Sequence, residues 1–180
     1  MTATHYLGRY LAPTTTAVDG DHTDLALSYA AKRLELPSLN EKQKEAVRTF
    51  VAGKDVFVSL PTGFEMSFCF QSVPLMLDYL GSSESNEEED KHIALVVEPT
   101  AAMCHQVSML EAKNISSAFI NQEQEDWSAK QAVVDGKTKF VHISPESLGI
   151  PNYRDMLYSD ANQQRLAVFA VDKVHCILTW

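Results

Sequence analysis

The sequence predicts an α/β fold in which a parallel β-sheet is flanked by helices. Five short apolar runs alternate with segments of helical periodicity. Strands that are buried on both faces appear as continuous apolar runs, and the strand–helix–strand order favours parallel strands joined by right-handed crossovers. Because such sheets bind ligands at the carboxyl ends of their strands, the chemistry is expected just after Leu60 and just after Val171.

Each predicted element has a local justification. The apolar runs place strands at 56–60, 93–97, 118–120, 140–143 and 166–171. The periodic segments place helices at 24–36, 41–52, 67–80, 101–112 and 127–134. Pro37 ends the first helix, Asn40 caps the second, Gly53 fits the stop of the second, and Asp135-Gly136 closes the last.

Composition indicates one domain of an ordinary soluble type. The chain has 180 residues, is 45% hydrophobic and 22% charged, and carries a formal net charge of -9. Such an acidic balance argues against charge-driven nucleic-acid binding. The three widely spaced cysteines favour a reducing intracellular compartment over a disulfide framework or zinc site, and no apolar run is long enough for a membrane span.

The domain boundaries follow from local composition. Residues 1–23 show no clear period and are expected to form a flexible leader, with one domain over 24–180. The acidic, serine-rich stretch 81–91 is expected to be a solvated loop, with a regulatory phosphosite as the alternative.

The segment 60–67 has the strand–turn–helix arrangement of a phosphate-binding loop. A helix N-terminus favours phosphate through its free N–H groups and its dipole. Thr62 and Gly63 match the start of such a loop, and Ser67 stands where a hydroxyl holds Mg²⁺. Met66 replaces the phosphate-binding lysine, and Glu65 replaces the preceding glycine. The alternative is a plain strand–helix turn.

The run 166–171 ends in Asp172, where a carboxylate can hold Mg²⁺ in this kind of fold. The position after it, where a glutamate would activate water, holds Lys173, which is not a base at neutral pH. His175 completes an Asp-x-x-His pattern; taken alone, it is a structural or surface histidine.

Several segments, in this order, resemble the motifs of RecQ-like DNA helicases. The matching segments are Leu39-Asn-Glu-Lys-Gln43, Leu60-Pro-Thr-Gly63 with Ser67-Phe-Cys-Phe-Gln71, Val96-Val-Glu-Pro-Thr100 with His105-Gln-Val107, Ile143-Ser-Pro-Glu-Ser-Leu148, and Ala170-Val-Asp-Lys-Val-His-Cys176 followed by Trp180. The resemblance covers residues 34–180. It implies the first RecA-like lobe of a nuclear enzyme that uses ATP and Mg²⁺ to unwind DNA in the 3′-to-5′ direction, in repair and recombination.

The resemblance also implies individual roles. These are adenine contact for Gln43, phosphate contacts for Thr62 and Gly63, Mg²⁺ binding for Ser67 and Asp172, and coupling of nucleotide to DNA for His175.

The departures from the family pattern predict impaired catalysis. Met66 and Lys173 remove the phosphate lysine and the catalytic glutamate, Asn40 replaces a basic residue of the adenine motif, and Glu98 adds a negative charge to a DNA-facing segment. The sequence ends at Trp180, so the lobe is expected to be truncated after its DExH-type motif, without the second lobe that completes a helicase ATP site.

Enzymatic activity therefore stays open, with weak or absent binding of ATP, Mg²⁺ and DNA expected. The alternatives are a pseudo-ATPase module that binds a protein partner, and a non-functional truncated remnant.

Overall fold

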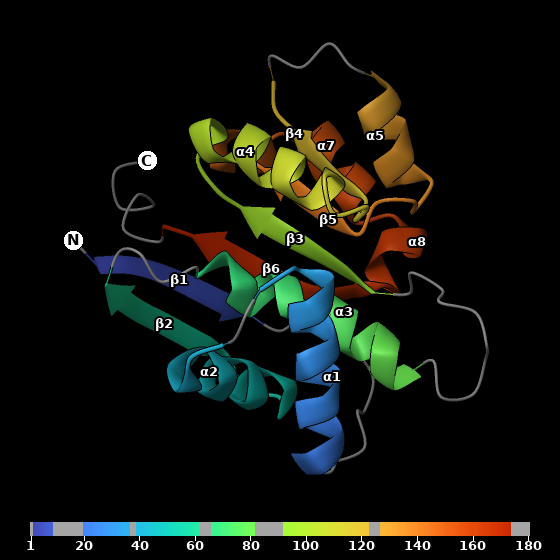
Figure 1. The fold of residues 1–180 in the computed structure, drawn as a ribbon. Helices are drawn as coiled ribbons and strands as arrows, with labels where there is room; N and C mark the ends of the chain where they lie inside the picture. The colour runs from blue at the N-terminus through green and yellow to red at the C-terminus, as the bar shows by residue number, and fades with distance from the viewer. Residues whose placement is uncertain are drawn as a thin grey trace.

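A computed structural model describes residues 2–8, 20–36, 39–61, 66–81, 92–122 and 127–173. Six strands form one sheet in the order β2-β1-β6-β3-β5-β4 (Figure 1). Their bounds are β1 (Thr2–Gly8), β2 (Val56–Pro61), β3 (Ile93–Val97), β4 (Ser117–Ile120), β5 (Phe140–Ile143) and β6 (Leu166–Asp172). All five predicted strands are present, and β6, β3, β5 and β4 pair in parallel. The predicted α/β class is confirmed.

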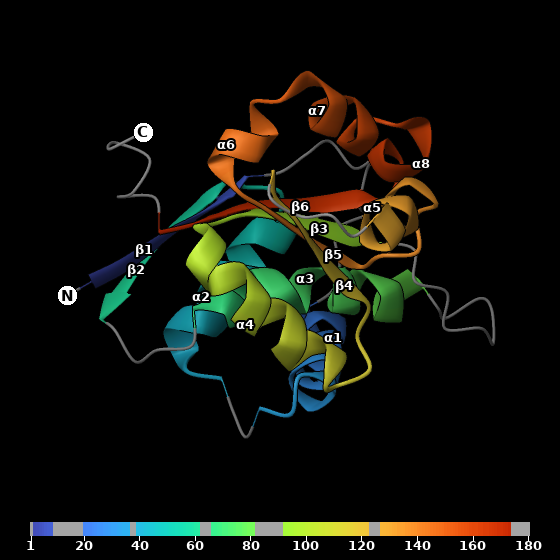
Figure 2. The same ribbon diagram turned by 90° about the horizontal axis from the view of Figure 1, so that it is seen from above.

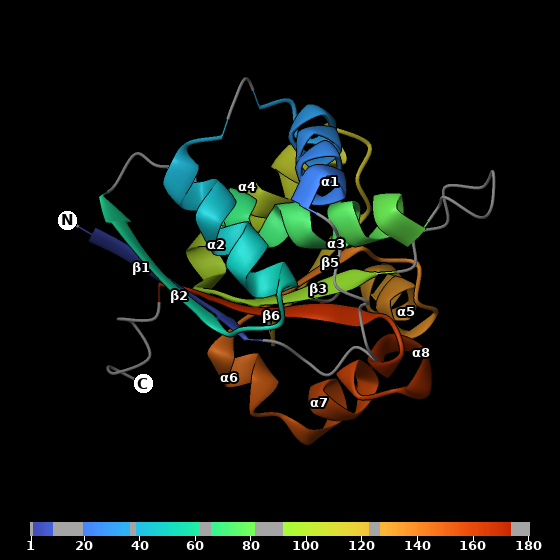
Figure 3. The same cartoon turned by 90° about the horizontal axis from the view of Figure 1, so that it is seen from below.

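Helices cover both faces of this sheet. Four lie on one face: α1 (Gly20–Arg33), α2 (Glu41–Val51), α3 (Ser67–Gly81) and α4 (Thr100–Glu111). The others lie on the opposite face: α5 (Trp127–Val134), α6 (Pro145–Leu148), α7 (Pro151–Leu157) and α8 (Asp160–Gln163) (Figures 2 and 3). A hydrophobic core fills each interface, because side chains of a buried strand alternate between the two faces.

The N-terminal strand corrects one prediction. Residues 1–23 were expected to be a flexible leader, but Thr2–Gly8 forms β1, which pairs antiparallel with β2 on one side and β6 on the other. The backbone N–H and C=O groups of β1 are thereby satisfied by two neighbours. In addition, α1 begins at Gly20, before the predicted start at residue 24, and ends at Arg33. Residues 9–19 lie outside the described part.

Local capping follows the sequence signals. Asn40 caps α2 in a capping box with Gln43, and Gly53 (φ 89°) and Gly136 (φ 69°) adopt the left-handed conformation that favours glycine after a helix. Gly81 is the last residue of α3, and the remainder of the predicted acidic loop, 82–91, lies outside the described residues. Among the described helices, none combines the length and apolar character needed to span a bilayer.

Candidate functional site

The candidate nucleotide site is only partly described. Gln43, Met66, Ser67, Asp172 and Lys173 are placed, at the start of α2, the start of α3 and the end of β6. Thr62, Gly63, Glu65 and His175 lie outside the described residues, as does Trp180. Their predicted roles therefore stay predictions.

The position of the phosphate lysine is filled by a core side chain. Met66 is 4% exposed and belongs to the core between the sheet and α1–α4. Its carbonyl oxygen accepts a hydrogen bond from the Cys69 N–H at 3.0 Å, in the first turn of α3. Ser67, which begins α3, is half-buried. An apolar, inward-packed side chain at this position provides no positive charge for a phosphate.

Asp172 is the last residue of β6 and is buried. Lys173 follows in the left-handed conformation (φ 59°), which a non-glycine residue rarely adopts, and so ends the strand. The strand pairs of β1 place His5 next to Asp172 on one side and next to Val58 on the other. The strand that leads to the phosphate loop is thus separated from Asp172 by an intervening strand, an arrangement that the sequence did not reveal.

Gln43 has a structural use at the start of α2. Its side-chain Oε1 accepts a hydrogen bond from the Asn40 N–H at 3.0 Å, and Asn40 Oδ1 accepts one from the Gln43 N–H at 2.9 Å. Gln43 is buried at this point. A contact between adenine and Gln43 Oε1 would compete with this capping box. The adenine contact of Gln43 stays a prediction.

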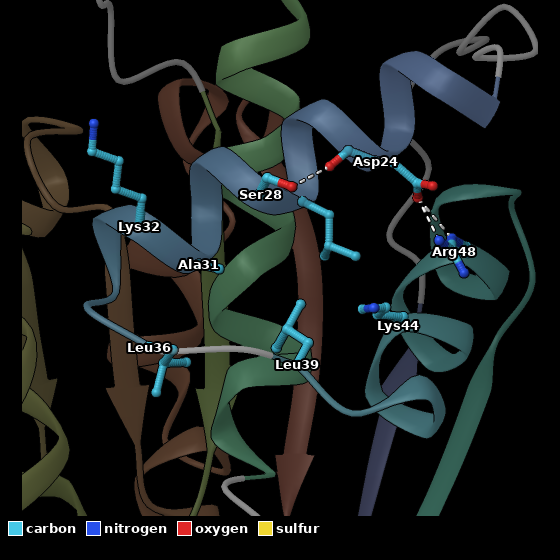
Figure 4. Close-up of a pocket in the computed structure, with 9 residues that line it drawn as sticks. Asp24, Ser28, Ala31, Lys32, Leu36, Leu39, Lys44 and Arg48 are labelled. Atoms are coloured by element: carbon cyan, nitrogen blue, oxygen red, sulfur yellow. Dashed lines mark hydrogen bonds and ion pairs between the residues drawn. The ribbon is translucent and has the colours of Figure 1, made fainter.

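A groove of about 560 Å³ lies between α1 and α2, beside this capping box. Figure 4 shows Arg48 of α2 reaching Asp24 of α1, with Arg48 Nε and Asp24 Oδ1 3.0 Å apart. Lys44 is paired with Glu41 at 2.7 Å. Both cations that α2 contributes to the groove are therefore compensated, and Gln43 does not line it. Lys32 of α1 is a third cation at the groove, and its exposed side chain comes from a different helix than the one that Met66 precedes.

A buried Glu–His pair lies at the carboxyl ends of β3 and β5. Glu98 and His142 are both 0% exposed, and His142 Nδ1 lies 2.6 Å from Glu98 Oε1. Within the described residues, Glu98 Oε2 and His142 Nε2 have no hydrogen-bond partner. The Glu98 carboxylate was expected to add charge to a DNA-facing segment; this is wrong, because the side chain is enclosed and paired. The apolar run around His142 gave no sign of the pair.

Two glutamines from the family-like segments also meet. Gln71 Nε2 of α3 donates to Gln106 Oε1 of α4 at 2.9 Å. The hydrogen bond joins the helix that follows the phosphate loop to the helix that follows β3. The two segments therefore lie next to each other, although the sequence related them only by their order along the chain.

The described residues offer little further metal or thiol chemistry. They contain no cluster of three His, Cys, Asp or Glu side chains that could hold a metal ion. Burial raises the pKa of the Cys69 thiol to about 12, so this thiol stays protonated at neutral pH. Cys104 is exposed.

Comparison with known proteins finds several helicases. The chain is 27% identical over 154 residues to "ATP-dependent DNA helicase Q-like SIM" of Arabidopsis thaliana, which covers 85% of this chain and 16% of that protein. It is 30% identical over 145 residues to "ATP-dependent DNA helicase Q5" of Rattus norvegicus, covering 77% and 14%. It is 27% identical over 146 residues to "Probable ATP-dependent DNA helicase RecS" of Bacillus subtilis, covering 79% and 26%.

The chain thus spans between 14% and 26% of the length of these three relatives. No protein-family model matches it.

Proposed function

Since the chain is related to the RecQ-like DNA helicases over 77% to 85% of its length, we propose that it is a helicase-type ATP-binding lobe that has lost ATP hydrolysis. The lobe would comprise residues 24–180, with β1 added to its sheet from the preceding segment. The relatives are named as ATP-dependent DNA helicases.

The observation that carries this proposal is the burial of Met66. A phosphate-binding lysine must extend into the nucleotide site and supply positive charge. Met66 is packed into the core instead, so the negative charge that develops on the transferred phosphate would have no partner from this position. Because a methionine side chain does not titrate, no change of pH gives this position the missing positive charge.

The second loss is at Lys173. A glutamate after the Mg²⁺-binding aspartate orients the attacking water, and a protonated lysine cannot accept the proton of that water. Lys173 also adopts a left-handed backbone conformation, so this turn, and not the alternation of side chains along β6, sets the direction of its side chain. Two separate parts of the hydrolytic machinery are therefore absent.

The remaining residues offer oxygen atoms of the kind that Mg²⁺ prefers. Ser67 supplies a hydroxyl at a helix N-terminus and Asp172 a carboxylate, both of which are oxygen ligands that Mg²⁺ prefers. When bound, Mg²⁺ would neutralise phosphate charge. Without a cation at Met66, the residues support weak nucleotide binding and no hydrolytic step.

DNA binding, a role in repair or recombination, and nuclear location are proposed from the names of the relatives. The net charge of -9 makes DNA binding by this lobe alone weak. Two alternatives remain: a pseudo-ATPase module that binds a protein partner, and a non-functional remnant. The well-packed core on both faces of the sheet favours the module, because a decayed sequence has no need to keep its interior apolar.

The test is a titration with a fluorescent ATP analogue in the presence of Mg²⁺. The expected dissociation constant of the wild-type chain is millimolar or weaker, and Met66→Leu, which keeps the apolar volume, should behave identically. The double variant Met66→Lys with Lys173→Glu should bind more tightly if it remains folded by circular dichroism. Micromolar binding by the wild-type chain would contradict the weak nucleotide binding that is expected without the phosphate lysine.

A further inference from the structure

The edge of the sheet at β4 is open to an additional strand. In the strand order, β4 is terminal and pairs only with β5. Its other side faces a groove of about 490 Å³ that residues of α4 and α5 line. The two helices cover opposite faces of the sheet, so the groove follows the strand edge between them.

The register identifies the backbone groups that face this groove. The Ser116 carbonyl oxygen accepts a hydrogen bond from the Phe140 N–H at 3.1 Å, and Ser117 lies opposite Phe140. In a parallel ladder, alternate residues of a strand bond to a given neighbour. Ser116 and Ala118 therefore point their backbone groups at β5, whereas Ser117 and Phe119 point theirs at the groove. No described residue provides these outward groups with a hydrogen bond.

The walls of the groove leave room for a second backbone. Small side chains line it from both helices: Ser108 of α4 and Ser128, Ala129 and Ala132 of α5. The Ser108 hydroxyl can donate or accept a hydrogen bond beside an added peptide. The space suits an extended segment of a few residues with small or polar side chains.

Most of the usual protections of an edge strand are missing from the described residues around β4. Proteins block such edges by keeping the strand very short or with lysine, proline, a bulge or a covering element, and of these β4 has only its short length of four residues. The β4 sequence Ser-Ala-Phe-Ile contains neither lysine nor proline, its pairing with β5 is regular, and no described element covers the outer side. An unprotected edge that lies within a shaped groove is suited to strand addition.

Charge at the groove favours a basic partner. Lys137 is held in an ion pair with Asp135 at 3.0 Å. Glu111, at the end of α4, is exposed and makes no ion pair with a described residue. The groove therefore presents one uncompensated carboxylate at the end where the chain turns from α4 into β4, on a chain of net charge -9. The same net charge opposes docking of a second copy or of a nucleic acid.

We propose that an extended segment of a partner protein, carrying a basic residue, docks in this groove as an additional strand beside β4. Its backbone pairs with the N–H and C=O groups of Ser117 and Phe119, and its basic side chain reaches Glu111. This inference does not depend on nucleotide binding or hydrolysis.

The test uses a fluorescein-labelled eight-residue peptide of alternating threonine and valine that ends in lysine, with fluorescence polarisation as the readout. The wild-type chain should bind it, and Ser117→Pro should weaken binding about tenfold or more, because proline removes an outward N–H and introduces bulk. Ser117→Ala, which keeps the N–H, should bind within about twofold of wild type. Glu111→Gln should weaken binding about two- to fivefold, as expected for an exposed ion pair.

A second variant covers the case in which Ser117→Pro does not fold. Ala132→Arg leaves the β4 backbone intact and fills the groove, so it should abolish binding while its circular dichroism stays unchanged. Absence of peptide binding by the wild-type chain at millimolar concentration, or equal binding by Ala132→Arg, would overturn the proposal. A dimer in sedimentation velocity that Ala132→Arg disperses would also overturn it, because the occupant would then be a second copy.

Discussion

The buried pair of Glu98 and His142 should make a large and strongly coupled contribution to stability. Both side chains are fully enclosed, and their polar atoms lie 2.6 Å apart. Replacing either residue alone by leucine leaves the other polar group buried without its partner, which costs about 3–5 kcal/mol. For a chain of this length, the corresponding decrease in Tm is roughly 6–20 °C.

The double variant should behave differently from the sum of the single variants. Replacing both residues by leucine removes the pair together with Glu98 Oε2 and His142 Nε2, which have no partner in the described part of the chain. A buried, hydrogen-bonded polar pair exchanged for apolar side chains of similar shape is often neutral in stability or better. The double variant should therefore be more stable than either single variant, with a coupling free energy of about 3 kcal/mol or more.

The assay is urea unfolding followed by circular dichroism for the wild type, the two single variants and the double variant. Equal m-values would show that the unfolding transitions are comparable. Glu111→Gln is the matched control, since it removes an exposed carboxylate and should change stability by less than about 0.5 kcal/mol. Single variants within 1 kcal/mol of wild type, or a double variant destabilised by the full sum, would refute the reasoning.

Three further outcomes follow from local contacts. Asn40→Ala should lower stability by about 1 kcal/mol in urea unfolding, whereas Asn40→Asp keeps the cap acceptor and should stay near wild type. Burial alone would raise the pKa of Asp78, but its hydrogen bond with His92 and its contact with Lys139 lower that pKa below the ordinary value of 3.8. The contribution of Asp78 to folding stability is therefore present above pH 3.8 and is lost as the pH falls further. Asp78→Asn should flatten this acid dependence of stability, and an unchanged profile would count against the reasoning. Iodoacetamide followed by mass spectrometry should modify Cys104 and spare Cys69; equal modification would contradict the burial of Cys69.

The elements that could be predicted from the sequence are those with a strong local signal. Apolar runs of strand length correctly predicted β2 to β6. Asn40 and Gly53 correctly predicted the two ends of α2, because a helix cap depends on neighbours within a few residues. The short helices α6–α8 were missed, since pieces of four to seven residues carry too little periodicity. Strand β1 was missed because its partner strands, β2 and β6, lie far away in the chain.

The candidate site was predictable in kind but not in arrangement. The sequence indicated that Met66 could not act as a lysine, and the structure adds that the side chain belongs to the core. Nothing in the sequence indicated that Glu98 and His142 meet, because that contact depends on β3 and β5 being neighbours in the sheet. The capping role of Gln43 was also missed: Asn40 was correctly predicted to cap α2, whereas Gln43 was noted only as an adenine contact.

The central claim is that this lobe keeps a helicase fold without ATP hydrolysis. The most direct measurement is ATP hydrolysis by the purified chain, with Mg²⁺, in the presence and absence of single-stranded DNA. The account predicts phosphate release at the background rate under both conditions. Release above background that rises on addition of DNA, and is lost in Asp172→Ala, would contradict it.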